Sequence, residues 1–174
     1  MQSRSEYALV IKRASLEKAL RLISQTMAHL KDRRSQNVEG NFYVDSSCID
    51  CDTCRRVAPQ SFGREGSASA VYHQPTTDSE RVAALEALLA CPTASIGTRD
   101  KPLDIQAIQQ RFPLKVNDNV YYCGYHSKKS YGAASYFIQR TAAEGGNILI
   151  DSPRFTPPLV KRLEAMGGVP HLYL

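Results

Sequence analysis

The cysteines near the middle of the chain are the residues best suited to chemistry. Cys48, Cys51 and Cys54 are separated by two residues each, and Cys91 lies further along, directly before a proline. Thiolates this close together can share one metal centre, and thiolate is the ligand that soft iron and zinc sites select. The spacing therefore predicts a metal site that combines the first three cysteines with Cys91.

The residues after the third cysteine indicate how many clusters such a site holds. Proteins with two iron–sulfur clusters carry the run C-x2-C-x2-C-x3-C-P, whose fourth cysteine binds the other cluster. Here that position is Ala58, although Pro59 still follows it. We therefore predict one 4Fe–4S cluster with the four cysteines named above as ligands. A structural zinc site is the alternative, but such sites are typically built from paired C-x2-C units.

Composition bounds the class of protein. The chain has 174 residues, 43% of them hydrophobic, and no apolar run approaches the ~20 residues that a membrane span requires. No secretory signal is present, so the five cysteines are expected in a reducing compartment, where clustered cysteines indicate metal or redox chemistry. The expected location is the cytoplasm, or the plastid stroma if the N-terminus is a transit peptide.

The net charge of +5 is concentrated at the N-terminus. Residues 1–34 hold eight Lys or Arg and three acidic residues, and the rest of the chain is balanced. The basic pI therefore indicates no nucleic-acid surface on the folded part, and no nucleic-acid partner is expected. Apolar residues at helical spacing predict an amphipathic helix over 15–31, inside a basic extension of residues 1–36. That helix would dock on the protein, target it to an organelle, or bind a membrane surface.

Short elements on both sides of the cysteines are predicted to position the site. Residues 42–44 should form a strand that leads into the cysteine loop, and residues 70–73 a second strand. A helix capped by Asp78 or Ser79 should end at Cys91, because Pro92 cannot continue its hydrogen-bond ladder. An apolar shell for the cluster is expected from Ile49, Val57, Phe62, Val71 and Ile96.

Residues 40–98 resemble the single-cluster ferredoxins of bacterial type. The resemblance rests on Cys48-x2-Cys51-x2-Cys54, Pro59, Phe62, a helix, and Cys91-Pro92. It implies an α+β arrangement of short strands and two helices, one-electron transfer, and a redox partner protein. Relatives with a 3Fe–4S cluster commonly lack the middle cysteine, so the presence of Cys51 favours 4Fe–4S.

The chain changes character after this domain, which we place at residues 37–100. Residues 101–116 are predicted to be a linker with a short helical segment. Beyond the linker, Thr156 and Pro157 should open a helix. Strands are predicted over residues 120–125, 134–140, 147–151 and 169–174.

Residues 117–174 resemble the beginning of a metallo-β-lactamase fold. The resemblance rests on a hairpin, the strand Leu149-Ile150-Asp151-Ser152-Pro153, and the helix and strand that follow it. The run from Tyr121 to Ser127 is similar to fusions of ferredoxin and metallo-β-lactamase domains in photosynthetic organisms. The family's metal ligands would begin at Leu174, where the chain stops, so no dinuclear metal site is expected. The sheet would be truncated, with an apolar edge at residues 169–174 that is prone to self-association.

The fold class is therefore predicted as α+β, with a small ferredoxin-like domain followed by an incomplete metallo-β-lactamase-like segment. Other residues in that segment are expected to have structural roles. Asp151 is expected to form a turn or cap, and His126 and His171 to be solvent-facing or simply hydrogen-bonded. Cys123 is expected to be an inert buried residue.

Three functions are compatible with these features. We predict the first, an iron–sulfur electron-transfer protein that carries one electron or feeds it to the attached domain. Arg55 and Arg56 beside the cluster would then dock an acidic partner or simply be solvated. The second is a metal-dependent hydrolase of the metallo-β-lactamase fold, regulated by the ferredoxin domain. The chain as it stands is not expected to be an enzyme. The third is a structural cluster that stabilises a small domain.

Overall fold

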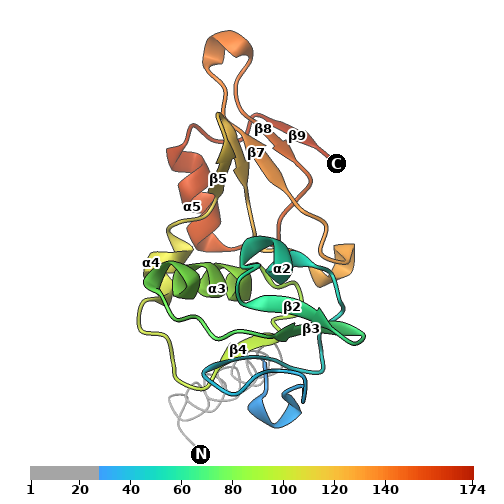
Figure 1. Ribbon diagram of the computed structural model, residues 1–174. Coiled ribbons are helices and arrows are strands. Elements are labelled where there is room, and N and C mark those ends of the chain that lie inside the picture. Colours follow the sequence, from blue (N-terminus) through green and yellow to red (C-terminus); the bar gives the residue numbers. More distant parts are fainter. Residues whose placement is uncertain (1–27) are drawn as a thin grey trace, which may run out of the picture.

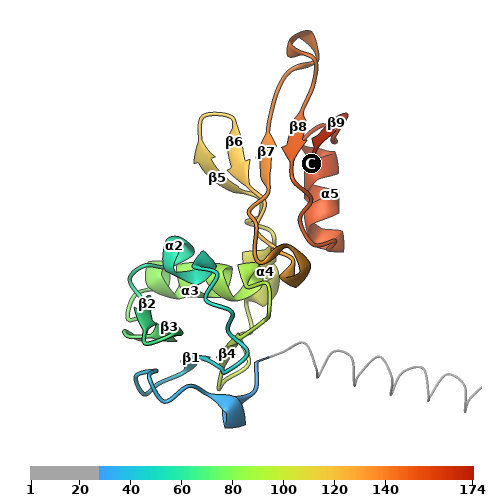
Figure 2. The same ribbon diagram turned by 90° about the vertical axis from the view of Figure 1, so that its right-hand side faces the viewer.

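A computed structural model of the protein describes residues 28–174, which form two groups of elements that meet at helix α3 (Figures 1 and 2). The predicted basic amphipathic helix lies almost wholly outside the described residues. Within them, its last residues form the short 3-10 turn η1, Leu30–Asp32. No described helix is long and apolar enough to cross a membrane.

The first group contains the cysteines and two small antiparallel sheets. Strand β1 (Phe42–Val44) pairs with β4 (Ile96–Thr98), and β2 (Phe62–Glu65) pairs with β3 (Ala68–Val71). The short helix α2 (Thr53–Val57) follows the cysteine loop. This group is mixed α and β, as predicted, but β2 was not predicted and β3 begins two residues before the expected strand.

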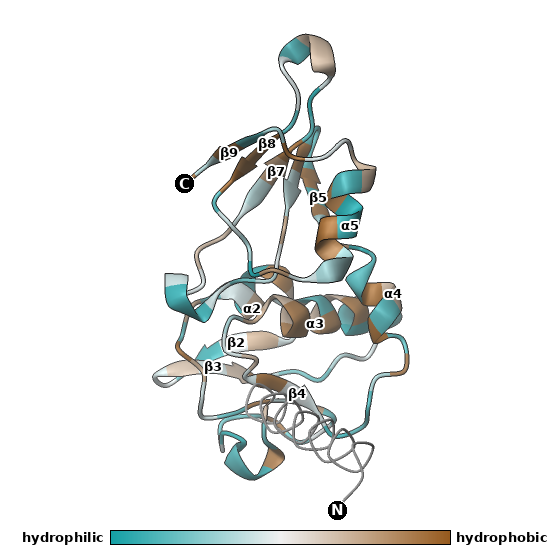
Figure 3. Ribbon diagram, turned by 180° about the vertical axis from the view of Figure 1, so that it is seen from behind, coloured by the Kyte–Doolittle hydropathy of each residue, from teal (hydrophilic) through white to brown (hydrophobic). Residues whose placement is uncertain are grey.

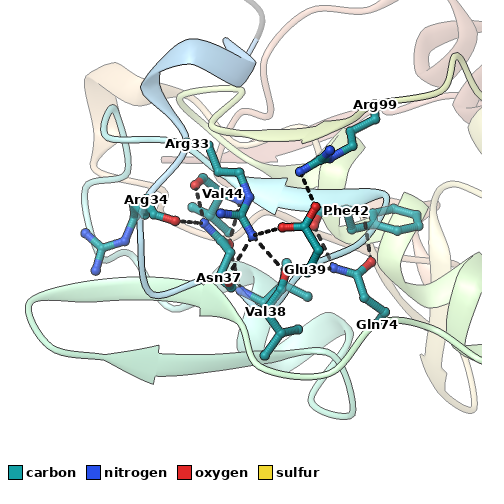
Figure 4. A network of polar contacts seen from close by, with 10 residues as sticks. Arg33, Arg34, Asn37, Val38, Glu39, Phe42, Val44, Gln74 and Arg99 are labelled. Atoms are coloured by element: carbon teal, nitrogen blue, oxygen red, sulfur yellow. Dashed lines mark hydrogen bonds and ion pairs between the residues drawn. The ribbon is translucent and has the colours of Figure 1, made fainter.

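The side-chain amides of Asn37 and Gln74 form hydrogen bonds with the backbone of β1 (Figure 4). Asn37 is buried; its Oδ1 accepts from the backbone N–H groups of Val44 and Val71, and its Nδ2 donates to the Val44 carbonyl. The Gln74 amide bonds both the N–H and the carbonyl of Phe42. These bonds satisfy backbone groups of β1 that no strand reaches, which a buried segment requires.

The chain before β1 is also tied to the fold. The His29 N–H donates to Asp45 Oδ2 at 2.9 Å, and Tyr43 Oη donates to the Ala28 carbonyl at 3.1 Å. Arg33 forms an isolated antiparallel bridge with Asp45. Residues 28–33 are therefore hydrogen-bonded to β1 and the residue after it.

Helix α3 (Asp78–Ala90) packs against both groups. Its N-cap is Thr77, not Asp78 or Ser79 as predicted: the Thr77 hydroxyl accepts from Glu80 N–H, and the Glu80 carboxylate accepts from Thr77 N–H. This reciprocal capping box satisfies two donors that a helix start leaves unpaired. Pro92 follows directly after the C-cap, Cys91, as expected.

The second group is a five-stranded sheet in the order β5-β6-β7-β8-β9. Strands β5 (Leu114–Asn117), β6 (Val120–Tyr122), β7 (Tyr136–Ile138) and β8 (Ile148–Ile150) pair antiparallel with their neighbours. The last strand, β9 (His171–Tyr173), is parallel to β8 because α5 (Pro157–Ala165) connects the two. Thr156 and Pro157 open α5 as predicted.

A second hydrophobic core lies between this sheet and α5. Phe112, Phe137, Leu149, Leu159 and Leu163 are buried in it. Figure 3 shows α5 with an apolar and a polar side, the pattern of a helix that covers one face of a sheet. Residues 101–116, predicted to be a linker, hold helix α4 (Ile105–Gln109) and most of β5.

Candidate metal centre

The four cysteines predicted as ligands come from two segments that the fold brings together. Cys48, Cys51 and Cys54 lie in and after the loop that precedes α2, and Cys91 is the C-cap of α3. All four thiols are free and line one enclosed pocket, whose apolar walls include Val44, Ile49 and Ile96. Cys54 and Cys91 are each only 8% exposed.

The cysteine loop has an unusual backbone that one arginine stabilises. Asp50 and Asp52 both adopt the left-handed region, with φ of 55° and 68°, which costs energy for residues other than glycine. Arg55 donates to Asp50 Oδ1 at 2.6 Å and to Asp52 Oδ1 at 2.5 Å. Its side chain is 17% exposed, so the prediction that Arg55 is simply solvated is wrong. Arg56 is 74% exposed and pairs with Asp52.

Hydrogen-bonding groups surround the sulfur atoms. The Thr53 hydroxyl lies 3.4 Å from Cys51 Sγ, and the Ser95 N–H donates to Cys91 Sγ at 3.3 Å. Ser69 is hydrogen-bonded to Cys54, and its Oγ accepts from Arg55 Nη1 at 2.6 Å. The Arg55 N–H is accepted by a lone pair of the Ser69 oxygen. The hydroxyl hydrogen of Ser69 is therefore available to the sulfur of Cys54. Such donors stabilise negative charge on a metal-bound thiolate.

Burial affects the protonation of two of these thiols, Cys54 and Cys91. Burial raises the pKa of Cys54 to about 12, and the hydrogen bond from Ser69 opposes this by lowering the pKa. Burial likewise raises the pKa of Cys91, although bonds from Thr93 and Ser95 work in the other direction. A bound cation would favour the ionised form of Cys54 and Cys91, which is what a metal centre does.

The spacing of the side chains distinguishes two kinds of centre. Among residues 28–174, no three His, Cys, Asp or Glu side chains are close enough to hold one metal ion. A tetrahedral zinc ion requires its sulfur ligands within ~2.3 Å of a single atom. The four cysteines of a 4Fe–4S cluster each bind a different iron atom, which places their sulfurs farther apart. The two kinds of centre therefore differ in the separation that they require between their sulfur ligands.

A loop from the second group covers the pocket at Cys51. Gly132 has a φ of +79°, and a Cβ placed on it would lie 3.0 Å from Cys51 Cβ and 3.4 Å from Pro92 Cγ. Only a glycine allows the backbone so close to the cysteine in this conformation. The loop before it begins at Ser127 and contains the 3-10 turn η2, Lys128–Ser130.

His126 holds this covering loop to both cysteine segments. Its Nδ1 faces the Gly132 carbonyl and also the Thr53 hydroxyl at 3.2 Å, and its backbone N–H donates to the Ala90 carbonyl at 3.3 Å. Its Nε2 lies 2.5 Å from Tyr122 Oη. A carbonyl only accepts, so Nδ1 carries the proton and Nε2 accepts from the tyrosine. Burial lowers the pKa of His126, consistent with a neutral ring.

The other predicted residues lie away from the pocket. Cys123 is fully buried in the second core, as expected for an inert residue. His171 is exposed and hydrogen-bonded to the Gly145 carbonyl at 2.8 Å. Asp151 ends β8 with a φ of 57°, and its N–H donates to Tyr173, which agrees with a turn.

Sequence reasoning missed Gly132 and the structural part that His126 plays. The run from Tyr121 to Ser127 contains His126 but does not show its contacts, because the role of both residues comes from the contact between two distant segments. The position of Gly132, beside Tyr131 and a pair of lysines, resembles an ordinary surface turn.

Comparisons with known proteins agree with this geometry for one part of the chain. No curated protein and no solved structure matches the sequence. One family model does match, and its limits, residues 44–98, run from the last residue of β1 to the last residue of β4 and include all four cysteines. The predicted cofactor, one 4Fe–4S cluster, is thereby confirmed, because this segment matches the 4Fe-4S single cluster domain of Ferredoxin I.

Proposed function

We propose that the protein is a one-electron carrier, or a redox input to its own second group of elements, with Cys48, Cys51, Cys54 and Cys91 as the cluster ligands. The observation that carries the proposal is the convergence of these four thiols on one enclosed pocket. The family match over the same segment supports it. When bound, the cluster supplies the chemistry, which is the gain and loss of one electron.

The surrounding residues would control that chemistry. The apolar walls exclude water, and Ser69 and Ser95 place hydrogen-bond donors near sulfur. Both factors set the reduction potential of a cluster. No substrate bond needs to break for this function, so no general acid or base is required.

The experiment that tests the proposal compares two cysteine variants. After anaerobic reconstitution, the wild type should be brown, contain about four iron and four sulfide per chain, and give an EPR signal on reduction with dithionite. Cys91→Ser should lose most of this iron. Cys123→Ser, a matched change at a buried cysteine in the other core, should keep it.

Two results would overturn the proposal. A colourless protein with one equivalent of zinc after reconstitution would show a zinc site. Full iron and an unchanged EPR signal in Cys91→Ser would show that Cys91 is not a ligand.

We further propose that the redox partner is an acidic protein that docks beside the cysteine loop. Arg56 and Arg64 are both exposed there, and each forms an ion pair with an aspartate of the loop. Complementary charge raises the rate of encounter, and salt screens it. Electron transfer to a true partner should therefore slow as ionic strength rises.

The second candidate, a metal-dependent hydrolase of the metallo-β-lactamase fold, concerns residues 117–174. The observation that favours it is the order of elements: a meander of antiparallel strands, then β8, α5 and a parallel β9. The test is a hydrolysis assay of this chain with added zinc or iron. We expect no turnover, and metal-dependent turnover would favour the hydrolase over the electron carrier.

A further inference from the structure

A cavity of about 590 Å³ lies between the cysteine-containing group and the five-stranded sheet. Its walls come from α2, α3, strands β5 to β7 and the loop that contains η2. This volume falls within the range of about 300–1,000 Å³ that is typical of small-molecule sites, which also occur preferentially between domains.

Two residues belong to both this cavity and the cysteine pocket. Cys51 and Thr53 line the large cavity and also the small pocket that the four thiols share. Cys48, Cys54 and Cys91 line only the small pocket. A molecule in the cavity would thus lie against Cys51, one of the four proposed ligands.

The cavity has aromatic walls suited to a flat molecule. Tyr122 and Tyr136 line it with ring centroids 6.0 Å apart, and His126 lies edge-on to Tyr122 at 5.4 Å. Tyr131, an almost fully exposed residue, stands at the rim. Rings of this kind bind planar aromatic molecules by stacking and edge-to-face contact. The hydrogen bonds of His126 to Gly132 and Tyr122 fix two of these walls in place.

The charges that border the cavity favour an anion. Glu86 is paired with Arg111, and Arg56 with Asp52. Lys115 also borders the cavity, and it forms no ion pair among the described residues. A bulge in the pairing of β5 between Lys115 and Asn117 allows the adjacent residues Lys115 and Val116 to border the same space. Among the residues that the structure describes, the cavity therefore has one cation, Lys115, free to bind a negative group.

We propose that this cavity binds a planar aromatic anion that is redox-active and exchanges one electron with the metal centre past Cys51. The inference rests on the proposed electron-transfer function and names the class of molecule that takes part. In the exchange one electron leaves the cluster and the same electron enters the ring system of the ligand. No bond forms or breaks, and any proton that the reduced ring requires comes from solvent.

The test uses flavin mononucleotide as an anionic planar probe and riboflavin as its matched uncharged form. Both are titrated into the oxidised, cluster-loaded full chain, and binding is followed by quenching of flavin fluorescence. We expect saturable binding of one flavin mononucleotide per chain. Lys115→Glu should weaken it about tenfold but change riboflavin binding by less than about twofold, since only the phosphate meets the reversed charge.

Two further variants separate a site from surface adsorption. Val116→Trp fills the cavity from a position that is 59% exposed, so the core need not repack, and it should abolish the binding of both flavins. Lys161→Glu makes the same charge change as Lys115→Glu on α5, outside the cavity, and should leave binding unchanged. No saturable quenching, or equal losses in Lys115→Glu and Lys161→Glu, would overturn the inference.

The failure of this inference can be told from the failure of the proposed function. A protein that holds a reducible cluster but binds neither flavin retains its electron-carrier function and lacks the cavity site. A protein that binds flavin mononucleotide as described but never assembles a cluster has the cavity site and lacks the electron-carrier function. In that case the proposed function is wrong.

Discussion

At the scale of single residues, the pairing of Arg55 with Asp50 and Asp52 determines the shape of the cysteine loop. The two aspartates take left-handed backbone angles, and the guanidinium bonds both carboxylates. The bond to Arg55 holds the pKa of Asp52 below its usual range. The same arginine donates to Ser69, which in turn is bonded to Cys54.

This chain of bonds predicts an effect of Ser69 on the reduction potential. A hydrogen bond to sulfur stabilises the reduced, more negative cluster, so Ser69→Ala should lower the potential. The expected shift is on the order of 40 mV, equivalent to about 1 kcal/mol for one electron. Potentiometric EPR titration measures it. Ser61→Ala, a change at another buried serine, should not shift the potential, and an equal shift in both variants would contradict the argument.

The sequence was sufficient to identify the cysteines but not the groups around them. Four cysteines and two prolines at fixed spacing can be recognised without a structure. The burial of Arg55 could not, since it depends on backbone angles at Asp50 and Asp52 that the sequence does not display. The position of Gly132 against Cys51 depends on the packing of two groups of elements.

At the scale of elements, helix α3 carries a capping box at its N-terminal end and a proposed cluster ligand, Cys91, at its C-terminal end. Thr77 caps the start of the helix, and Cys91 caps its end. Thr77→Ala should destabilise the helix by about 1 kcal/mol. Because Cys91 is held by the same helix, loss of iron to a chelator should become about fivefold faster if it proceeds through opening of the helix.

The control for this variant lies two residues away. Ser79→Ala removes an exposed hydroxyl that contacts only the Thr77 side chain among the described hydrogen bonds. It should change the rate of iron loss much less than Thr77→Ala. Similar rates in the two variants would show that the cap does not control Cys91.

The edge strand β9 predicts self-association. Within residues 28–174 it pairs only with β8, and Leu172 and Tyr173 are 51% and 61% exposed. An apolar strand edge is a template for pairing with another chain. Sedimentation velocity should show concentration-dependent dimers that Leu172→Glu reduces, whereas Lys161→Glu on the far side of α5 should not. A monomer at every concentration would contradict the prediction.

Element prediction succeeded where a pattern is long enough to be seen. Helix α3 follows from apolar spacing and from Pro92 after its end, and the start of α5 follows from Pro157 at its first position. Strands β2 and β5 were missed because β2 contains Gly63 and a charged pair, and β5 is mostly exposed. Strands of three or four residues are too short for a period of two to be distinguished from chance.

At the scale of the whole molecule, His126 predicts a pH dependence of stability. Its folded pKa is lowered by burial, so the unfolded chain binds more protons than the folded chain as pH falls below ~6.5. Stability contributed by the neutral ring is therefore present above that pH and is lost progressively below it. Chemical unfolding of the cluster-loaded chain at pH 8 and pH 5.5 measures the difference.

Two variants isolate the contribution of this histidine. His126→Asn keeps a donor near the position of Nδ1 but does not titrate, and its stability should fall less between the two pH values. His171→Asn, at the exposed histidine, should behave like the wild type. The same pH response in all three proteins would assign the effect to other groups.

The hydrogen bonds of residues 28–33 to β1 and Asp45 have a consequence for maturation of the protein. If a processing peptidase removes a targeting peptide, its cut must fall before Ala28, because a later cut would remove the bonds made by Ala28 and His29. Residues 1–27 contain five Lys or Arg and two acidic residues, so a cut directly before Ala28 would reduce the net charge of +5 to about +2. Mass spectrometry of the protein isolated from its host would locate that cut. The mature carrier would then lose most of its excess positive charge and keep the arginines beside the cluster.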